Sequence, residues 1–95
     1  MAQKLTQLKI TAKDLLVADL IDALLFLKSQ LRPNCEAYDE VIIAHERSNR
    51  INKALQKSLI SFNEADLLLN QIVNSVVFTI NNLKESDLAV EPPKQ

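Results

Sequence analysis

The side chains best suited to chemistry in this chain are His45, Cys35 and the acids around them. His45 is next to Glu46 and follows Asp39 by six residues, a grouping that invites acid–base catalysis or metal binding. It is, however, the only histidine, and Cys35 is the only cysteine, so a metal site lacks ligands and an internal disulfide cannot form. The sequence shows no nucleophile with a nearby base and no pocket-forming loop. We therefore predict no enzymatic activity, no metal and no cofactor, and interpret Cys35 as a half-buried thiol near a helix start.

The composition points to a small helical domain. The chain has 95 residues, of which 47% are hydrophobic and 24% charged, as in an ordinary folded domain. It contains no glycine, which argues against phosphate-binding loops and tight hairpin turns and favours helices. A net charge of -1 gives no reason to expect nucleic acid. Since no signal-peptide pattern and no long apolar run is present, we expect a soluble, cytoplasmic protein that does not enter membranes.

Hydrophobic spacing and helix-start residues divide the chain into helices. We predict an all-α bundle with a short helix near Ala12 to Val17 and longer helices near Leu20 to Leu31, Cys35 to Leu59 and Phe62 to Lys84. The expected organisation is an N-terminal arm or short helix at 1–10, a helical domain at 11–85 and a proline-containing tail or linker at 86–95. Asp19 and Asn34 are the expected caps of the second and third helices.

The two longest helices are predicted to form a central hairpin. Ser61 and Glu64 have the spacing of a capping box, which restarts a helix after a break near Ile60. Apolar and small residues recur every three or four positions before the break, as in the seam of a packed helix pair, and Leu59 is the last of them. The β-branched cluster between residues 72 and 80 resembles a strand when read alone, but the length of the helical pattern and the lack of a partner strand favour a helix.

Charge is segregated along the third helix. A basic group occupies one face of its second half: Arg50, Lys53 and Lys57, with Arg47 at the margin. An acidic group lies at the start of this helix: Glu36, Asp39 and Glu40. Either these residues form a solvated face, with acids favoured at helix starts by the dipole, or the basic patch of one copy meets the acidic patch of another. The second interpretation gives a heterologous contact that salt weakens.

Leu67, Phe78 and Asn70, together with Arg47, are candidates for contacts on or between the long helices. Leu67 and Phe78 fall opposite the core side of the last helix, so they pack against the N-terminal arm or form an interface with another molecule. Arg47 and Asn70 interrupt apolar patterns. They form either a polar cross-link between the two long helices or a pair of outward-facing recognition residues.

A set of short motifs keeps its order and spacing between residues 15 and 83. The motifs are Val41-Ile42-Ile43, Arg47-Ser48-Asn49, Ile60-Ser61, Glu64-Ala65 and Asn70-Gln71-Ile72. Together they resemble the effector-associated domain family of the eleventh type, small helical modules of bacterial conflict and signalling proteins. Two positions depart from the family pattern: Gln71 replaces an arginine, and Ser58 replaces a glycine that often precedes the final Leu-Ile-Ser. We expect a more continuous helix end at Ser58.

The resemblance implies an adaptor in bacterial defence signalling. One copy is then attached to an effector or sensor and another to its partner, and they meet by domain-to-domain contact, with homo-oligomers expected. The candidate interface residues are Arg47, Arg50, Lys53, Lys57, Leu67 and Phe78. The alternative is a stand-alone helical regulator or subunit that binds one unrelated protein. A third hypothesis, a DNA-binding domain, predicts a salt-sensitive shift of duplex DNA, and the balanced charge argues against it.

Overall fold

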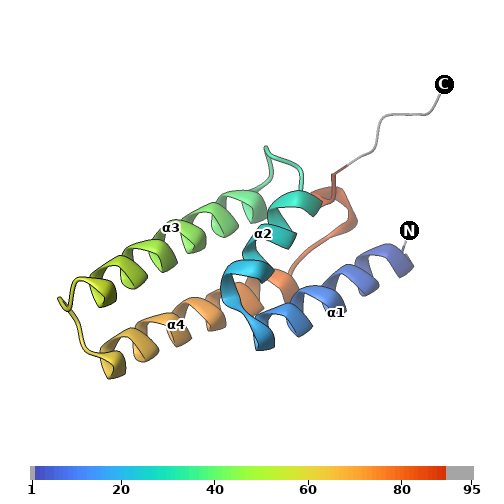
Figure 1. Ribbon diagram of the computed structural model, residues 1–95. Coiled ribbons are helices and arrows are strands. Elements are labelled where there is room, and N and C mark those ends of the chain that lie inside the picture. The colour runs from blue at the N-terminus through green and yellow to red at the C-terminus, as the bar shows by residue number, and fades with distance from the viewer. Residues whose placement is uncertain (1, 90–95) are drawn as a thin grey trace.

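A computed structural model describes residues 2–89, and these residues are almost entirely helical (Figure 1). The elements are α1 (Ala2–Ala18), α2 (Leu20–Gln30), α3 (Glu36–Gln56), α4 (Phe62–Asn81) and the short 3-10 helix η1 (Glu85–Asp87). No strand occurs among the described residues, which contain one isolated antiparallel bridge between Leu31 and Leu88. The all-α prediction is confirmed. No helix in this part of the chain combines the length and apolar character needed to cross a membrane.

The first helix is much longer than the sequence suggested. We predicted a short helix from Ala12 to Val17 after an arm or short helix at 1–10, whereas α1 is one helix of 17 residues and exceeds α2, which has 11. The reason lies in residues 5 to 12, where Leu5, Leu8 and Ala12 are spaced to share one helix face and Leu8 and Ala12 are buried in the core. Lys9 also donates a hydrogen bond through Nζ to the carbonyl of Asn81, 3.3 Å away, at the end of α4. The predicted arm is thus part of the helical fold.

The second helix forms largely as predicted. The carboxylate of Asp19 accepts a hydrogen bond from the backbone N–H of Asp22 at 3.1 Å, which caps the start of α2. Its inner face buries Ala23, Leu24 and Leu27. The helix ends at Gln30, shortly before Pro33, as expected for a residue that disfavours helical geometry in its predecessor.

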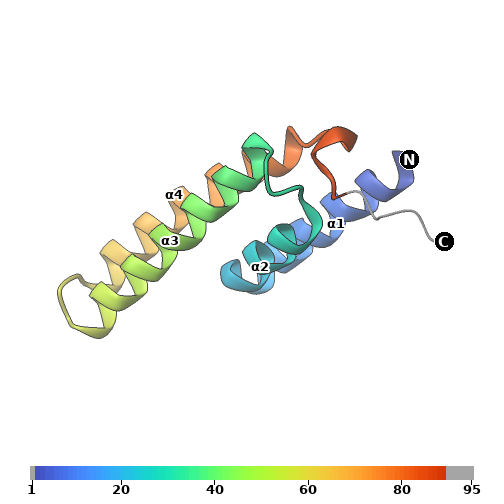
Figure 2. The same ribbon diagram turned by 90° about the horizontal axis from the view of Figure 1, so that it is seen from above.

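Helices α3 and α4 lie side by side and antiparallel in both views, forming the predicted hairpin (Figures 1 and 2). Small buried residues on α3, Ala44 and Ser48, allow α4 to approach closely. The capping box is confirmed, because the Ser61 hydroxyl accepts from the Glu64 N–H at 3.1 Å and the Glu64 carboxylate accepts from the Ser61 N–H at 3.2 Å. At the start of α3 the cap is Cys35 instead of Asn34: its sulfur accepts from the Tyr38 N–H at 3.4 Å.

The turn between α3 and α4 differs from expectation at Ser58. We expected a more continuous helix end there, but α3 stops at Gln56 and Ser58 adopts φ of 59°, in the left-handed region. The Leu59 N–H donates to the Ala54 carbonyl at 2.8 Å, and the Ser58 N–H donates to the Leu55 carbonyl at 3.0 Å. This hydrogen-bond pair defines a Schellman motif, whose left-handed position is usually a glycine. Ser58 therefore ends the helix in the conformation that glycine adopts more easily.

The segment after α4 returns to the body of the domain. Residues 86–95 were predicted to form a tail or linker, but Leu88 is only 6% exposed and bridges to Leu31. The Arg32 N–H donates to the Asp87 carbonyl at 2.9 Å, and the Ala89 N–H donates to the Gln30 carbonyl at 2.8 Å. Residues 85–89 are therefore part of the fold. The rest of the predicted linker, 90–95 with its two prolines, lies outside the described residues.

The core occupies only part of the length of the hairpin. Its largest fully buried side chains come from α2, α3 and α4: Leu24, Leu27, Val41, Ile72 and Ile80. Figure 2 shows that α1 and α2 flank the end of the hairpin nearest the chain termini, while the α3–α4 turn extends beyond them. No residue from 49 to 64 is buried, and we call this segment the hairpin tip. The domain is accordingly elongated, with extents of 53 × 21 × 19 Å.

Candidate protein-interaction surfaces

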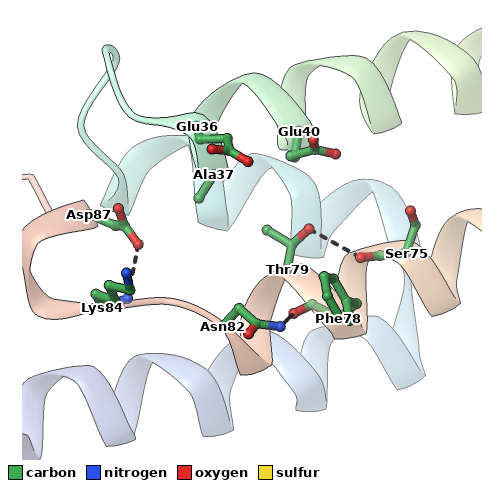
Figure 3. Close-up of a pocket in the computed structure, with 9 residues that line it drawn as sticks. All are labelled: Glu36, Ala37, Glu40, Ser75, Phe78, Thr79, Asn82, Lys84 and Asp87. Carbon is green, nitrogen blue, oxygen red and sulfur yellow. Dashed lines mark hydrogen bonds between the residues drawn. The ribbon is translucent and has the colours of Figure 1, made fainter.

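A groove lies between the first turns of α3 and the last turns of α4, next to η1 (Figure 3). Its volume is about 430 Å³. The residues that give it chemical character are Glu36, Glu40, Phe78, Thr79, Lys84 and Asp87. Three of these six are acids and one is a base, so we call it the acidic groove. Its presence depends on η1, which brings Asp87 to the side of the hairpin.

Most polar groups on the α4 side of the acidic groove are already engaged with the backbone. The Thr79 hydroxyl donates to the Ser75 carbonyl at 3.1 Å, and the Asn82 side-chain amide donates to the Phe78 carbonyl at 2.7 Å. The Asp87 carboxylate accepts from the Lys84 N–H at 2.9 Å. These contacts fix the polar side chains on the α4 side of the groove, where Phe78 is 69% exposed.

The α3 side of the acidic groove carries two carboxylates with no such engagement. Glu36 and Glu40 are one turn apart and exposed, and Figure 3 shows them across from Thr79 and Phe78. Within residues 2–89 neither carboxylate makes a hydrogen bond or an ion pair. The helix dipole favours an acid in the first turn, which accounts for Glu36, but its effect fades beyond that turn, where Glu40 lies. Both carboxylates are open to a cation.

The three basic residues in the second half of α3 and its C-cap Lys57 are all exposed. They are Arg47, Arg50, Lys53 and Lys57, which we call the basic stripe. Successive members are three or four positions apart, so they follow the helix surface toward the turn. Lys53 lies in the last turn of α3, where the helix dipole favours a cation. The dipole therefore accounts for this member of the basic stripe without a binding partner.

Leu67 and Phe78 are both exposed on α4, at 62% and 69%. Their separation of eleven residues is close to three helical turns, so they share one face. It also places them about 16 Å apart along the axis. The structure therefore puts Phe78 at the acidic groove and Leu67 near the hairpin tip, and does not join them in one apolar patch.

Arg47 and Asn70 do not occupy the seam between the long helices. Both side chains are exposed, and in the described part of the chain no hydrogen bond connects them. The seam near them is filled instead by Ser48, whose hydroxyl donates to the Ala44 carbonyl at 2.9 Å, and by the small side chain of Ala65. The burial on which the cross-link alternative depended is absent at both positions.

His45 and Cys35 remain separate from any cluster of ligands. His45 is half-buried on α3, and the buried Cys35 thiol caps that helix while donating to the Asp87 carbonyl at 3.7 Å. Among residues 2–89, no group of three or more His, Cys, Asp or Glu side chains is placed to hold a metal ion. Cys35 thus ties the start of α3 to η1.

The sequence patterns missed two exposed residues at the hairpin tip. Leu59 was expected in the seam but is 73% exposed, and Phe62 at the start of α4 is 77% exposed. A signal for this was present in the predicted helix lengths. The helix predicted at Leu20 to Leu31 is about half as long as the one predicted at Cys35 to Leu59. A helix of that length can cover only half of the hairpin, so the other half stays exposed.

The comparison with protein families agrees with the helical architecture. The sequence model of effector-associated domain 11 matches residues 3–84, from the first turn of α1 to just before η1. No curated protein and no solved structure matches the chain. The match covers most of the 95 residues and includes the segment at 3–10 that the motifs alone had left out. The chain belongs to the effector-associated domain 11 family.

Proposed function

We propose that this chain is a non-enzymatic adaptor or oligomerisation module that recruits or clusters an effector in bacterial defence signalling. The observation that carries the proposal is the family match over residues 3–84, which identifies the whole helical unit as an effector-associated domain. In this role the domain connects an effector to another protein. The proposal assigns this connection to contacts between helical surfaces of two such domains in the cytoplasm.

The hairpin tip supports this role. It exposes Leu59 and Phe62, with Leu67 about one and a half turns farther along α4, and none of its residues is buried by α1 or α2. Apolar side chains gathered on a projecting, uncovered end of a domain are typical of surfaces that another protein covers. The basic stripe runs toward the same end and supplies charge for orienting a partner.

The acidic groove is better suited to binding than to catalysis. Covalent catalysis needs a side-chain nucleophile next to a base, but the Thr79 hydroxyl donates to the backbone of its own helix. His45 lies on α3 and is not among the residues that line the groove. The groove offers carboxylates and one aromatic ring, which are recognition groups for a cation.

The proposal is tested by measuring mass in solution against concentration for the chain alone and for the chain mixed with a polypeptide that carries a second domain of this family. Light scattering should show a mass that rises with concentration in at least one of the two samples. If both samples stay monomeric over the full range while circular dichroism shows intact helices, the adaptor role is refuted. One-to-one binding to an unrelated protein without self-association would instead support a stand-alone regulator.

A further inference from the structure

We propose that the acidic groove of one copy of this chain binds the basic stripe of a second copy, so that copies associate head to tail. The inference rests on the proposed function and specifies the surfaces by which like domains meet. It assigns a role to the unengaged carboxylates of Glu36 and Glu40 and to the exposed ring of Phe78.

The acidic groove has the groups that recognise a guanidinium or ammonium ion. Glu36, Glu40 and Asp87 outnumber the single cation Lys84 among its lining residues. Phe78 contributes an exposed aromatic ring to the same groove, and a cation above such a ring is attracted by its quadrupole. A volume of about 430 Å³ accommodates the end of a long basic side chain together with part of its aliphatic stem.

The basic stripe is the complementary surface. Its four cations project from exposed positions on the second half of α3 and at its C-cap. Arg50, near its centre, presents a planar fork of donors that suits carboxylates. No hydrogen bond or ion pair engages the side chains of Arg50, Lys53 or Lys57 within residues 2–89.

The two surfaces of one molecule cannot satisfy each other. Glu40 and Arg47, the nearest members of the two surfaces, are on the same rigid helix and seven residues apart, which separates them by about 10.5 Å along its axis, and within residues 2–89 no ion pair joins them. Arg50 is farther still from Glu36. The groove of one molecule is therefore available to the stripe of another.

The head-to-tail arrangement has a defined symmetry. Because the groove and the stripe are different surfaces, the contact in it is heterologous, and a pair of copies leaves one groove and one stripe free to extend the chain. The product is a ring if the rotation between copies closes and an open filament if it does not. A two-fold dimer in which each groove takes the stripe of the other copy would pair the same charges, so a mass that stops at the dimer contradicts the head-to-tail arrangement.

The first test neutralises the groove. The double variant Glu36→Gln/Glu40→Gln retains side-chain size, and its matched control, Asp14→Asn/Asp66→Asn, removes the same charge from exposed positions elsewhere on α1 and α4. Sedimentation or light scattering should show the self-association Kd of the groove variant raised roughly tenfold or more, with the control within about twofold of wild type. Raising salt from about 0.05 M to about 0.5 M should weaken wild-type assembly more than assembly of the groove variant.

The decisive test exchanges the charges. Glu36→Arg/Glu40→Arg reverses the groove, and Arg50→Glu/Lys53→Glu reverses the stripe. Each variant alone should be monomeric at concentrations where wild type assembles, because like charges then meet at the contact. Mixed with each other, the two variants carry two compatible pairs of surfaces: the native stripe of one with the native groove of the other, and the reversed groove with the reversed stripe. The mixture should therefore form assemblies that neither variant forms alone.

The outcomes separate this inference from the proposed function. If both charge variants assemble as wild type does, the groove–stripe contact is refuted while association between domains stands. If the mixture of variants, each shown to be helical, fails to associate, the pairing is likewise refuted. If wild type itself stays monomeric at low salt, this inference fails, whereas binding to a family domain on another polypeptide would still support the proposed function.

Discussion

Ser58 offers a direct test of how the turn between α3 and α4 is built. This residue holds φ of 59°, a left-handed conformation in which the β-carbon crowds the following carbonyl oxygen. For a non-glycine residue the crowding costs about 1–2 kcal/mol. Glycine avoids that cost, but it loses more backbone freedom on folding, which reduces the gain in stability by about 0.5–1 kcal/mol. We therefore expect Ser58→Gly to stabilise the domain by about 0.5–1 kcal/mol.

The expected change is large enough to measure. For a domain of this size, 1 kcal/mol corresponds to a shift in Tm of about 4–8 °C, so the variant should melt about 2–8 °C above wild type. Urea unfolding followed by circular dichroism should show a higher midpoint at an unchanged slope, which indicates a change in stability and not in the surface exposed on unfolding.

Two control variants isolate the backbone conformation. Ser58→Ala keeps a β-carbon at the left-handed position, so it should bring no stabilisation. Ser75→Gly places the same new residue in the interior of α4, where glycine should destabilise by about 0.5–1 kcal/mol. If Ser58→Gly lowers the midpoint as Ser75→Gly does, the Schellman turn assigned to Ser58 is wrong.

Three further expectations concern the cap and the candidate interface. Ser61→Ala removes the hydroxyl that caps α4 and should lower stability by about 1 kcal/mol in a urea melt; an unchanged midpoint would show that the capping box contributes nothing. Arg47→Ala alters an exposed side chain and should leave stability within about 0.5 kcal/mol, so a loss well beyond that would restore the cross-link to Asn70. The double variant Leu67→Ser/Phe78→Ser should reduce oligomer mass in light scattering while helicity by circular dichroism stays the same, and an undiminished mass would remove both residues from the interface.

The parts of the fold that the sequence predicts are those with local signals. The box at Ser61 and Glu64 lies within four consecutive residues, and the cap at Asp19 also acts within its own first turn. Apolar spacing identified the inner faces of α2 and α4 for the same reason, since a helix repeats every few residues. None of these features depends on where the chain goes later.

The parts that the sequence did not predict depend on distant segments. Leu88 pairs with Leu31 through an isolated bridge, and no pattern in the residues next to Leu88 predicts this partner. The acidic groove depends on the same return, because it needs Asp87 beside Glu36. Leu59 followed the helical pattern, but its exposure was decided by how far α2 reaches along the hairpin.

The lack of buried residues from 49 to 64 also has a dynamic consequence. Local opening free energy depends on buried apolar contacts, so this end of the hairpin should unfold in sub-global fluctuations while α1, α2 and the base of the hairpin stay folded. Backbone amides there should exchange with solvent faster than those near Leu24 and Ile72 in the core. A partner that covers this end would restrict those openings, so association and local ordering would occur together, and slowed amide exchange would mark the bound surface.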